Sequence, residues 1–252
     1  MILRRLTTAL RKQDWVTVVI ETLIVVFGVF IGLQVNNWND AQAENRRSIQ
    51  ALGELRSEYE DIAVVVDELV AFYEGVIGDL QIVVATVHAD EITDEAKGAL
   101  IRALSYGDVF GDPPPPSGTF RDLQSAGDLR IISDKALRLR LIEYDQSLET
   151  INLSNAAITD MMAPFTPAFR RHSRLSTDYR LPKGDDFSFI DAELPAVVDA
   201  DYAALLADPD FRIASEQYLR LQVGRYFNAK VAQSKVHQIQ AIIDRNLAEG
   251  EP

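Results

Sequence analysis

The feature that most constrains this chain is a predominantly apolar run of twenty residues near its start, Val16–Val35, which contains one charge, Glu21, and no proline. Wound as a helix at about 1.5 Å per residue, the run is roughly 30 Å long, which matches the hydrocarbon core of a bilayer. The chain's two tryptophans, Trp15 and Trp38, flank the run, where indole rings act as interface anchors in the headgroup region. The sequence therefore predicts a single transmembrane helix over residues 15–38.

The charges beside this helix predict its orientation. Residues 1–14 contain one acid, Asp14, and form a basic tail with four positive side chains, Arg4, Arg5, Arg11 and Lys12. Because positive flanks stay in the cytoplasm, we expect a cytoplasmic N-terminus and a C-terminal domain on the other side of the membrane. The alternative is a cleaved signal peptide, since Ala41–Ala43 has the A-x-A pattern of a cleavage site. The apolar run exceeds the roughly 7–15 residues of the apolar h-region in a signal peptide, which favours a retained anchor.

Beyond the span the chain is strongly acidic. Its 25 basic and 38 acidic residues fall to 21 and 36 once residues 1–35 are removed, which leaves a net charge of −15 on residues 36–252. A surface of this charge argues against nucleic acid as a partner and against a domain that lies flat on anionic lipid. The chain has no cysteine, which excludes disulfides, thiolate catalysis and zinc–cysteine sites.

Two stretches of the chain have distinctive patterns. Residues 24–39, IVVFGVFIGLQVNNWN, end the span in a GLQ-x-x-NWN signature. Residues 119–145, TFRDLQSAGDLRIISDKALRLRLIEYD, combine an aromatic, a leucine, a small-Gly-x-Leu turn and a Leu-Arg helix that ends near a tyrosine. Both are similar to recurrent patterns of an uncharacterised family of bacterial single-pass inner-membrane proteins. The resemblance implies an N-terminal span in a bacterial inner membrane and an extracytoplasmic helical domain, which would be periplasmic. It implies no activity.

After the span the sequence favours one long helix. Its apolar residues recur at alternating spacings of three and four over five heptads, which is typical of a long bundle or coiled-coil helix. The seam positions are Leu52, Leu55, Tyr59, Ile62, Val66, Leu69, Tyr73, Val76, Leu80, Val83 and Val87. We expect a solvated stalk over residues 39–48 and a helix end near residues 88–92. The hydroxyls of Tyr59 and Tyr73 need a route to water, which favours the edge of a bundle over a dimeric seam.

Further helices are predicted from caps and apolar spacing. Two are long: Asp134–Met162, which Pro164 and Pro167 end, and Asp208–Glu249, which starts with an acid and a proline. Shorter helices are expected over Glu95–Ser105, Phe120–Ser125 and Tyr202–Ala207. The apolar face predicted for the last helix is Leu219, Val223, Phe227, Val231, Val236, Ile239, Ile243 and Leu247. The predicted fold is all-α: a transmembrane helix, then an antiparallel bundle of three long and two or three short helices over residues 49–252.

Two connections in this bundle have no helical pattern. Pro113–Pro116 are four consecutive prolines, which lack amide donors and favour a stiff polyproline II connector; a ligand for an aromatic groove is the alternative. Residues 173–198 are expected to be irregular, with a turn at Pro182–Asp186. We expect the loop to pack onto the bundle through Phe187, Phe189 and Ile190.

The sequence offers little for catalysis, so we expect a non-enzymatic protein without a cofactor. The three histidines, His88, His172 and His237, have none of the spacings of a metal or catalytic motif. The densest carboxylates could bind a divalent cation weakly, but acids so placed are more often helix caps and solvated loop residues. They are Asp185, Asp186, Asp191, Asp199, Asp201, Asp208 and Asp210. We assign no catalytic residue and no metal ligand.

The strongest functional pattern lies inside the span. Gly28 and Gly32 form a G-x-x-x-G motif, which lets two helix backbones approach closely. Because Glu21 and Val25 fall on the same helix face, these four residues predict a helix-packing seam in the membrane. An ionised carboxylate that faces lipid is costly, so Glu21 is expected to face protein. The alternative is that Glu21, about 8 Å inside the span, reaches the interface or is protonated.

Three functions are compatible with this sequence. The first is a membrane-anchored interaction or scaffold protein in the lipid bilayer, which self-associates as a homo-oligomer or docks another membrane protein. The second is a sensor, whose extracytoplasmic bundle binds a ligand and signals through a partner, because residues 1–14 are too short for an output domain. The third is an accessory subunit of a proton-driven membrane complex, in which Glu21 carries protons.

Overall fold

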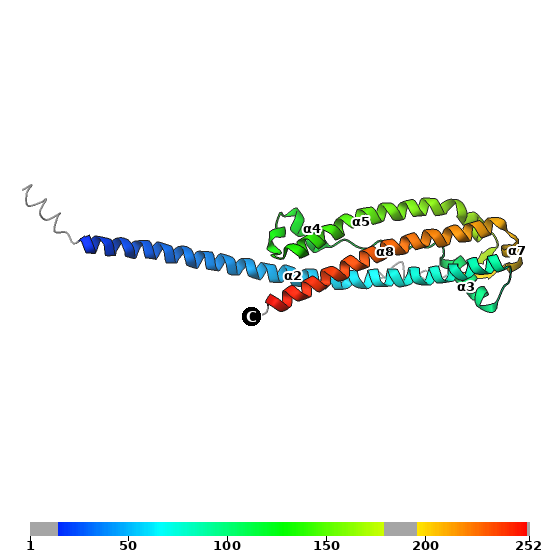
Figure 1. Ribbon diagram of the computed structural model, residues 1–252, viewed down its shortest axis with the longest axis horizontal. Coiled ribbons are helices and arrows are strands. Elements are labelled where there is room, and N and C mark those ends of the chain that lie inside the picture. The colour runs from blue at the N-terminus through cyan, green and yellow to red at the C-terminus, as the bar shows by residue number, and fades with distance from the viewer. Residues whose placement is uncertain (1–14, 179–195, 251–252) are drawn as a thin grey trace, which may run out of the picture. The chain divides into compact units, whose positions relative to one another are not determined.

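The structure, a computed structural model, describes residues 15–178 and 196–250 (Figure 1). The basic tail, the expected turn at Pro182–Asp186 and the loop residues Phe187, Phe189 and Ile190 lie outside these ranges. The described elements are helices apart from one two-stranded sheet, which confirms the all-α class. The chain divides into two compact units, Met1–Ala51 and Leu52–Pro252, which are considered in turn.

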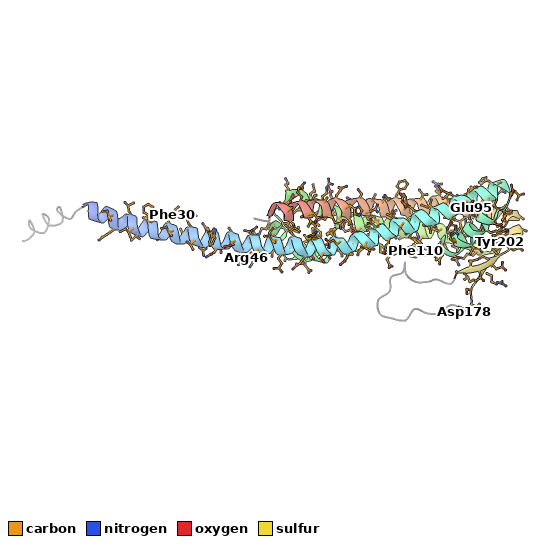
Figure 2. All side chains as sticks on the ribbon, turned by 90° about the horizontal axis from the view of Figure 1, so that it is seen from below. Phe30, Arg46, Glu95, Phe110, Asp178 and Tyr202 are labelled. Carbon is orange, nitrogen blue, oxygen red and sulfur yellow. The ribbon has the colours of Figure 1, made fainter. Side chains whose placement is uncertain are left out.

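The described residues of the first unit belong to helix α2, Trp15–Ala89. The side chains from Ile20 to Val35 are exposed, and Phe30 is among those that project from the helix (Figure 2). By length and composition, this segment could cross a membrane. The helix continues without a break through the predicted stalk, residues 39–48, and its end at Ala89 confirms the expected boundary.

The second unit contains the rest of α2 and two more long helices, α5 (Lys135–Met162) and α8 (Pro209–Gly250). The short helices are α3 (Asp94–Tyr106), α4 (Gly118–Ser125), α6 (Thr166–Arg170) and α7 (Tyr202–Ala207), with 3-10 turns η1 (Leu129–Ile131) and η2 (Ala163–Phe165). Each long helix predicted from the sequence is therefore present. Figure 1 shows the three lying lengthwise beside one another in this unit.

Contacts at the helix ends fix the directions of the three long helices. Arg212, near the start of α8, donates to the carbonyl of Val87 near the end of α2, so this pair is antiparallel. Arg245, near the end of α8, pairs with Asp134 at the start of α5, so this pair is antiparallel too. Helices α2 and α5 therefore run in the same direction, as Figure 1 shows, and the antiparallel arrangement expected from the sequence is wrong for them.

The segment between α3 and α4 explains this parallel pair, because it returns along the bundle before α5 begins. Its start is held by Gln222, whose Nε2 donates to the carbonyl of Gly107 at 2.7 Å. Its end is held by Glu58, whose carboxylate accepts from the Ser117 hydroxyl at 2.6 Å. Between them Pro114 is buried, and the Tyr144 hydroxyl donates to the carbonyl of Pro115 at 2.7 Å. These contacts favour the connector interpretation of the prolines.

Capping residues lie at the helix ends. Thr93 caps α3 by accepting from the amide of Ala96 at 3.1 Å, and Asp134 caps α5. Asp208 precedes the proline that opens α8. After α4, Gly127 has a φ of 73°, a left-handed conformation that favours glycine and stops the helix.

The heptad seam predicted for α2 is confirmed, because every one of its positions is buried. Most lie in clusters shared with α5 and α8, and Leu69 and Tyr73 lie in a cluster shared with α8. One expectation about that seam is wrong. The hydroxyls of Tyr59 and Tyr73 were expected to reach water, but their side chains are only 0% and 2% exposed. The reason is that Tyr59 packs edge-on against Tyr144, with ring centres 5.8 Å apart, inside the core.

The apolar face predicted for α8 is wrong in its first half. Phe227 and Val231 are 61% and 46% exposed, and Leu219 and Val223 are only half-buried. The buried stripe consists of Phe211, Ala214, Ser215, Tyr218, Gln222, Arg225, Ala229, Ala232, Val236, Ile239 and Ile243. The second half of the prediction, from Val236, is confirmed apart from the half-buried Leu247. The error arose because three polar residues, Ser215, Gln222 and Arg225, occupy buried positions in this half of the helix.

The expectation of irregular structure over residues 173–198 is also wrong at its ends. Strands β1 (Ser173–Leu175) and β2 (Val197–Ala200) pair antiparallel, with Ser173 opposite Ala200. Strands of three and four residues are too short for an alternating pattern to be recognised in a sequence. The sheet is tied to α3, because the amide of Val197 donates to the Ser105 hydroxyl at 2.9 Å.

Candidate functional site

A polar layer crosses the bundle at one level, because each long helix places a polar residue on its buried side there. These residues are Tyr73 on α2, Asn155 on α5, and Gln222 with Arg225 on α8. Asn155 occupies a slot of the α5 spacing between two buried isoleucines, Ile151 and Ile158. Elsewhere the three seams meet as apolar clusters. The layer is therefore a local interruption of the core.

Arg225 is the central residue of this layer. It is only 1% exposed, and its Nη2 donates to the hydroxyl of Thr159 at 2.7 Å. Its guanidinium carbon lies 4.7 Å from the centre of the Phe110 ring, a cation–π distance. Within the described structure, Nε and Nη1 are buried and have no hydrogen-bond partner. A buried group in this state costs free energy, since its donors have lost water without a replacement.

The neighbouring polar groups hold the walls of the layer. Gln222 donates to the carbonyls of Gly107 and Val109, at 2.7 and 3.1 Å, and so fixes the segment that presents Phe110. Thr159 donates in turn to the carbonyl of Asn155 at 2.9 Å, which leaves its oxygen oriented to accept from Arg225. The arginine therefore sits in a scaffold of fixed hydrogen bonds.

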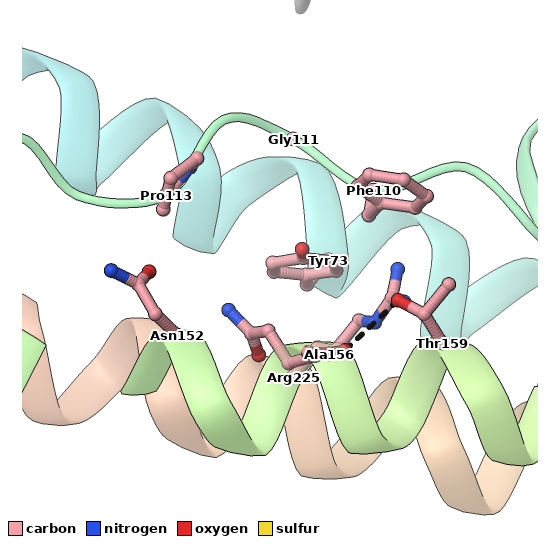
Figure 3. A pocket seen from close by; sticks show the side chains of 9 residues that line it. Tyr73, Phe110, Gly111, Pro113, Asn152, Ala156, Thr159 and Arg225 are labelled. Atoms are coloured by element: carbon pink, nitrogen blue, oxygen red, sulfur yellow. Dashed lines mark hydrogen bonds between the residues drawn. The ribbon is translucent and has the colours of Figure 1, made fainter. Parts of the chain in front are cut away.

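A cavity of about 200 Å³ opens next to Arg225. Figure 3 shows side chains from the three long helices converging on it below the segment that carries Phe110, Gly111 and Pro113. The lining residues are Tyr73, Phe110, Gly111, Pro113, Asn152, Asn155, Ala156, Thr159 and Arg225. Phe110 is 47% exposed and lies at the surface in Figure 2, so the cavity is close to solvent. Of the described residues that line it, Arg225 is the one with a formal charge.

The electrostatics of the cavity follow from burial. Burial lowers the pKa of Arg225, opposed by Tyr73, Tyr218 and Asp108, and an arginine remains protonated at neutral pH even so. Burial raises the pKa of Tyr73, while the charge of Arg225 and the backbone of Gly111 act against the rise. Asp108 is bound by Arg170, with contacts of 2.8 and 2.5 Å. Among the described residues no carboxylate forms an ion pair with Arg225.

The residues predicted as a membrane seam lie on the exposed part of α2. Glu21, Val25, Gly28 and Gly32 are exposed, and in the described structure a Cβ added at either glycine would meet nothing within 4 Å. The interface anchor Trp38 is 64% exposed. Trp15 begins the helix, and its side chain lies outside the description. Within the described chain, the seam therefore has no packing partner.

Each histidine of the bundle pairs with one carboxylate. His88 lies 2.8 Å from Glu216, His172 lies 3.0 Å from Asp208, and His237 lies 3.1 Å from Asp67. The carboxylates considered for a cation serve as caps and ion pairs where they are described: Asp199 pairs with Arg174, Asp201 caps α7, and Asp208 and Asp210 bind Arg171. Asp185, Asp186 and Asp191 lie outside the described residues. Within residues 15–178 and 196–250, no group of three or more possible ligands could hold a metal ion.

Arg225 was not predicted from the sequence, because the apolar face proposed for α8 consisted of hydrophobic residues alone. A signal was present: counting back in steps of seven from Ile239 reaches Ala232 and then Arg225. No family model, no curated protein and no solved structure matches the chain. The resemblance drawn from the GLQ-x-x-NWN signature stays a prediction.

Proposed function

We propose that the protein is a non-enzymatic, membrane-anchored helical interaction protein that self-associates or docks a membrane partner. The observation that carries this proposal is the exposed apolar segment of α2, whose side chains have no cover within the described chain. Lipid can solvate most of that segment, but the G-x-x-x-G motif and Glu21 favour a second helix on one face. The same helix continues into the core of the second unit, so the segment is covalently part of a folded domain.

The setting proposed for this function is a bacterial inner membrane, with a cytoplasmic N-terminus and a periplasmic second unit. The basic tail before the span and the net charge of −15 after it support this orientation. The resemblance to the family of single-pass inner-membrane proteins supports the same topology. The pairing of each bundle histidine with a single carboxylate favours a structural use of these residues over catalysis.

The test is a membrane two-hybrid assay on the full chain. Gly28→Ile and Gly32→Ile are expected to weaken association, because the added side chains hold two backbones apart. Glu21→Gln is expected to be milder, since an amide still hydrogen-bonds across a helix pair. Val26→Ile, on the opposite face, is the control and should associate like the wild type. If both glycine variants also associate like the wild type, the predicted seam is wrong. A loss of association in Glu21→Gln alone would favour the proton-carrying accessory subunit.

A second candidate function is ligand sensing, in which a small molecule bound in the bundle changes how the anchor meets its partner. The cavity beside Arg225 favours this candidate, because it joins a buried cation with two unsatisfied nitrogens to a space large enough for a ligand. Self-association measured with and without a bound ligand separates the two candidates. A scaffold is indifferent to the ligand, whereas a sensor changes its association because the ligand binds one state better than the other.

A further inference from the structure

We propose that the cavity beside Arg225 is a binding site for a small organic monocarboxylate. This inference rests on the second candidate function above, and it assigns the chemical class of the ligand. The site is built from Tyr73, Asn155, Thr159 and Arg225 on three helices, under the segment that holds Phe110 (Figure 3).

The charge of the ligand follows from the state of Arg225. The guanidinium is 1% exposed, has one hydrogen bond to Thr159, and has two nitrogens without a partner in the described chain. A buried cation is stabilised by a counter-charge that also accepts its hydrogen bonds. Asp108, the acid whose charge acts on Arg225, is already bound by Arg170. A ligand that brings an anionic oxygen would complete the site.

The ligand should carry one negative charge. Arg225 is the one charged residue among the described lining residues, so the cavity offers one positive charge. A phosphate monoester carries close to two negative charges at neutral pH and is usually met by several cations. The domain around the cavity is also strongly acidic, which opposes a second negative charge. A carboxylate satisfies the arginine without this penalty.

The rest of the ligand should be small and largely apolar. The cavity volume of about 200 Å³ exceeds the roughly 150 Å³ that holds a benzene molecule in an engineered core. Phe110, Pro113 and Ala156 supply an apolar wall, and Asn152 and Asn155 supply amide groups beside it. The site therefore fits a carboxylate on an aromatic or short aliphatic body.

The test is isothermal titration calorimetry on the full chain in detergent micelles, with acetate, hexanoate and benzoate as probes. Benzamide is the neutral match to benzoate, and phenylphosphonate is the doubly charged match. We expect benzoate or hexanoate to bind at least about tenfold more tightly than benzamide and phenylphosphonate. Benzamide lacks a charge-assisted hydrogen bond, and phenylphosphonate brings more negative charge than the one cation of the cavity balances. The proposal is overturned if none of the three carboxylates binds, or if benzamide binds as well as benzoate.

Two arginine variants on α8 separate the site from a general charge effect. Arg225→Met should abolish carboxylate binding, whereas Arg220→Gln, at an exposed position on the same helix, should bind like the wild type. Arg225→Met should also raise the unfolding temperature of the ligand-free protein, because it removes a buried charge that has two unsatisfied nitrogens and no counter-charge among the described residues. A fall in that temperature would show that the charge is already satisfied, and binding retained by Arg225→Met would place the carboxylate elsewhere. Either result contradicts the proposal.

The sensing function is tested separately by adding the bound carboxylate to the self-association assay. Binding in the calorimeter with no change in association leaves the site in place and removes the sensing function. A change in association that persists in Arg225→Met would be independent of this cavity, and it would remove the link between the site and sensing.

Discussion

Two tyrosines that pack against each other differ in how their hydroxyls are satisfied. The Tyr59 hydroxyl is buried without a hydrogen-bond partner in the described structure, while the Tyr144 hydroxyl donates to Pro115. We expect Tyr59→Phe to leave the free energy of unfolding unchanged or to raise it slightly, because no hydrogen bond is lost. Tyr144→Phe should lower it by about 0.5–1.5 kcal/mol. Urea denaturation of both variants checks the pair, and a larger loss in Tyr59→Phe would reveal a partner for its hydroxyl.

Acid should destabilise the bundle partly through Asp208. Burial alone would raise the pKa of this carboxyl, but the amide of Asp210, His172 and Arg171 together hold it below its ordinary value of 3.8. The folded state therefore binds the proton less readily than the unfolded state. Its contribution to stability is present above pH 3.8 and is lost as the pH falls through the lower, folded value.

Asp208→Asn tests this contribution, because asparagine also caps helices but carries no charge. We expect the variant to lose less stability than the wild type between about pH 5 and pH 3, as measured by urea denaturation midpoints. Asp208→Ala, which also removes the cap of α8, should cost a further 0.5–2 kcal/mol or so at neutral pH. Parallel pH profiles for wild type and Asp208→Asn would exclude this carboxyl as a source of acid sensitivity.

Helix α8 illustrates where sequence reasoning succeeded and where it failed. Its start and its apolar second half were predicted correctly, because a capping acid, a proline and branched aliphatics are local signals. In its first half, hydrophobicity alone selected Phe227 and Val231, although the heptad register runs through Gln222 and Arg225. Burial of Gln222 and Arg225 depends on neighbouring parts of the chain. Helix α5 supplies Thr159, and the segment after α3 supplies the carbonyl of Gly107. A single helix cannot reveal those partners.

The same contrast holds for the other elements. The seam of α2 could be predicted because its positions are apolar throughout, and an apolar seam has one physical explanation. The parallel course of α2 and α5 could not be predicted from the sequence, since it depends on long-range contacts of Glu58 and Gln222 with the segment between α3 and α4. The candidate cavity was missed for that reason too. It exists only where three helices and this segment meet.

The corrected register of α8 makes a direct prediction. Phe227→Ser and Val231→Ser should change the free energy of unfolding by no more than about 0.5 kcal/mol each, because both side chains are largely exposed. Ile239→Ala, at a fully buried position of the stripe, should cost about 2–5 kcal/mol. Thermal or urea unfolding of the three variants decides the register. Equal losses in the free energy of unfolding for Phe227→Ser and Ile239→Ala would instead support the apolar face first predicted from the sequence.

For the whole molecule, the charge asymmetry about the span predicts the topology. A periplasm-active reporter fused after Pro252 should be active, because a basic flank is expected to keep the N-terminus in the cytoplasm. Replacing Arg4, Arg5, Arg11 and Lys12 by glutamine is the matched variant and should reduce that activity. Activity from a cytoplasmic reporter alone at the same position would overturn the orientation.

The packing of the second unit predicts that it folds without the anchor. Its three long helices bury their seams against one another, in clusters that begin at Leu52 and contain residues of α2, α5 and α8. Both tyrosines of the α2 seam are also buried within the chain. In the described structure, no position of this seam is therefore left exposed for a second copy to cover. A soluble fragment that starts near Ile49 should therefore be a helical monomer.

Two core variants make this prediction quantitative. Leu69 and Val76 are 2% and 6% exposed on the α2 seam, so Leu69→Ala should cost the fragment about 2–5 kcal/mol and Val76→Ala somewhat less. Val64→Ala, at a position of the same helix that is 56% exposed, is the control and should have little effect. Ultracentrifugation and circular dichroism across a dilution series measure the oligomeric state and the helicity together. A fragment that folds only as a dimer and loses helicity on dilution would contradict the monomer. Because the seam of α2 would then need a second copy, the assembly surface would move from the membrane span to that helix.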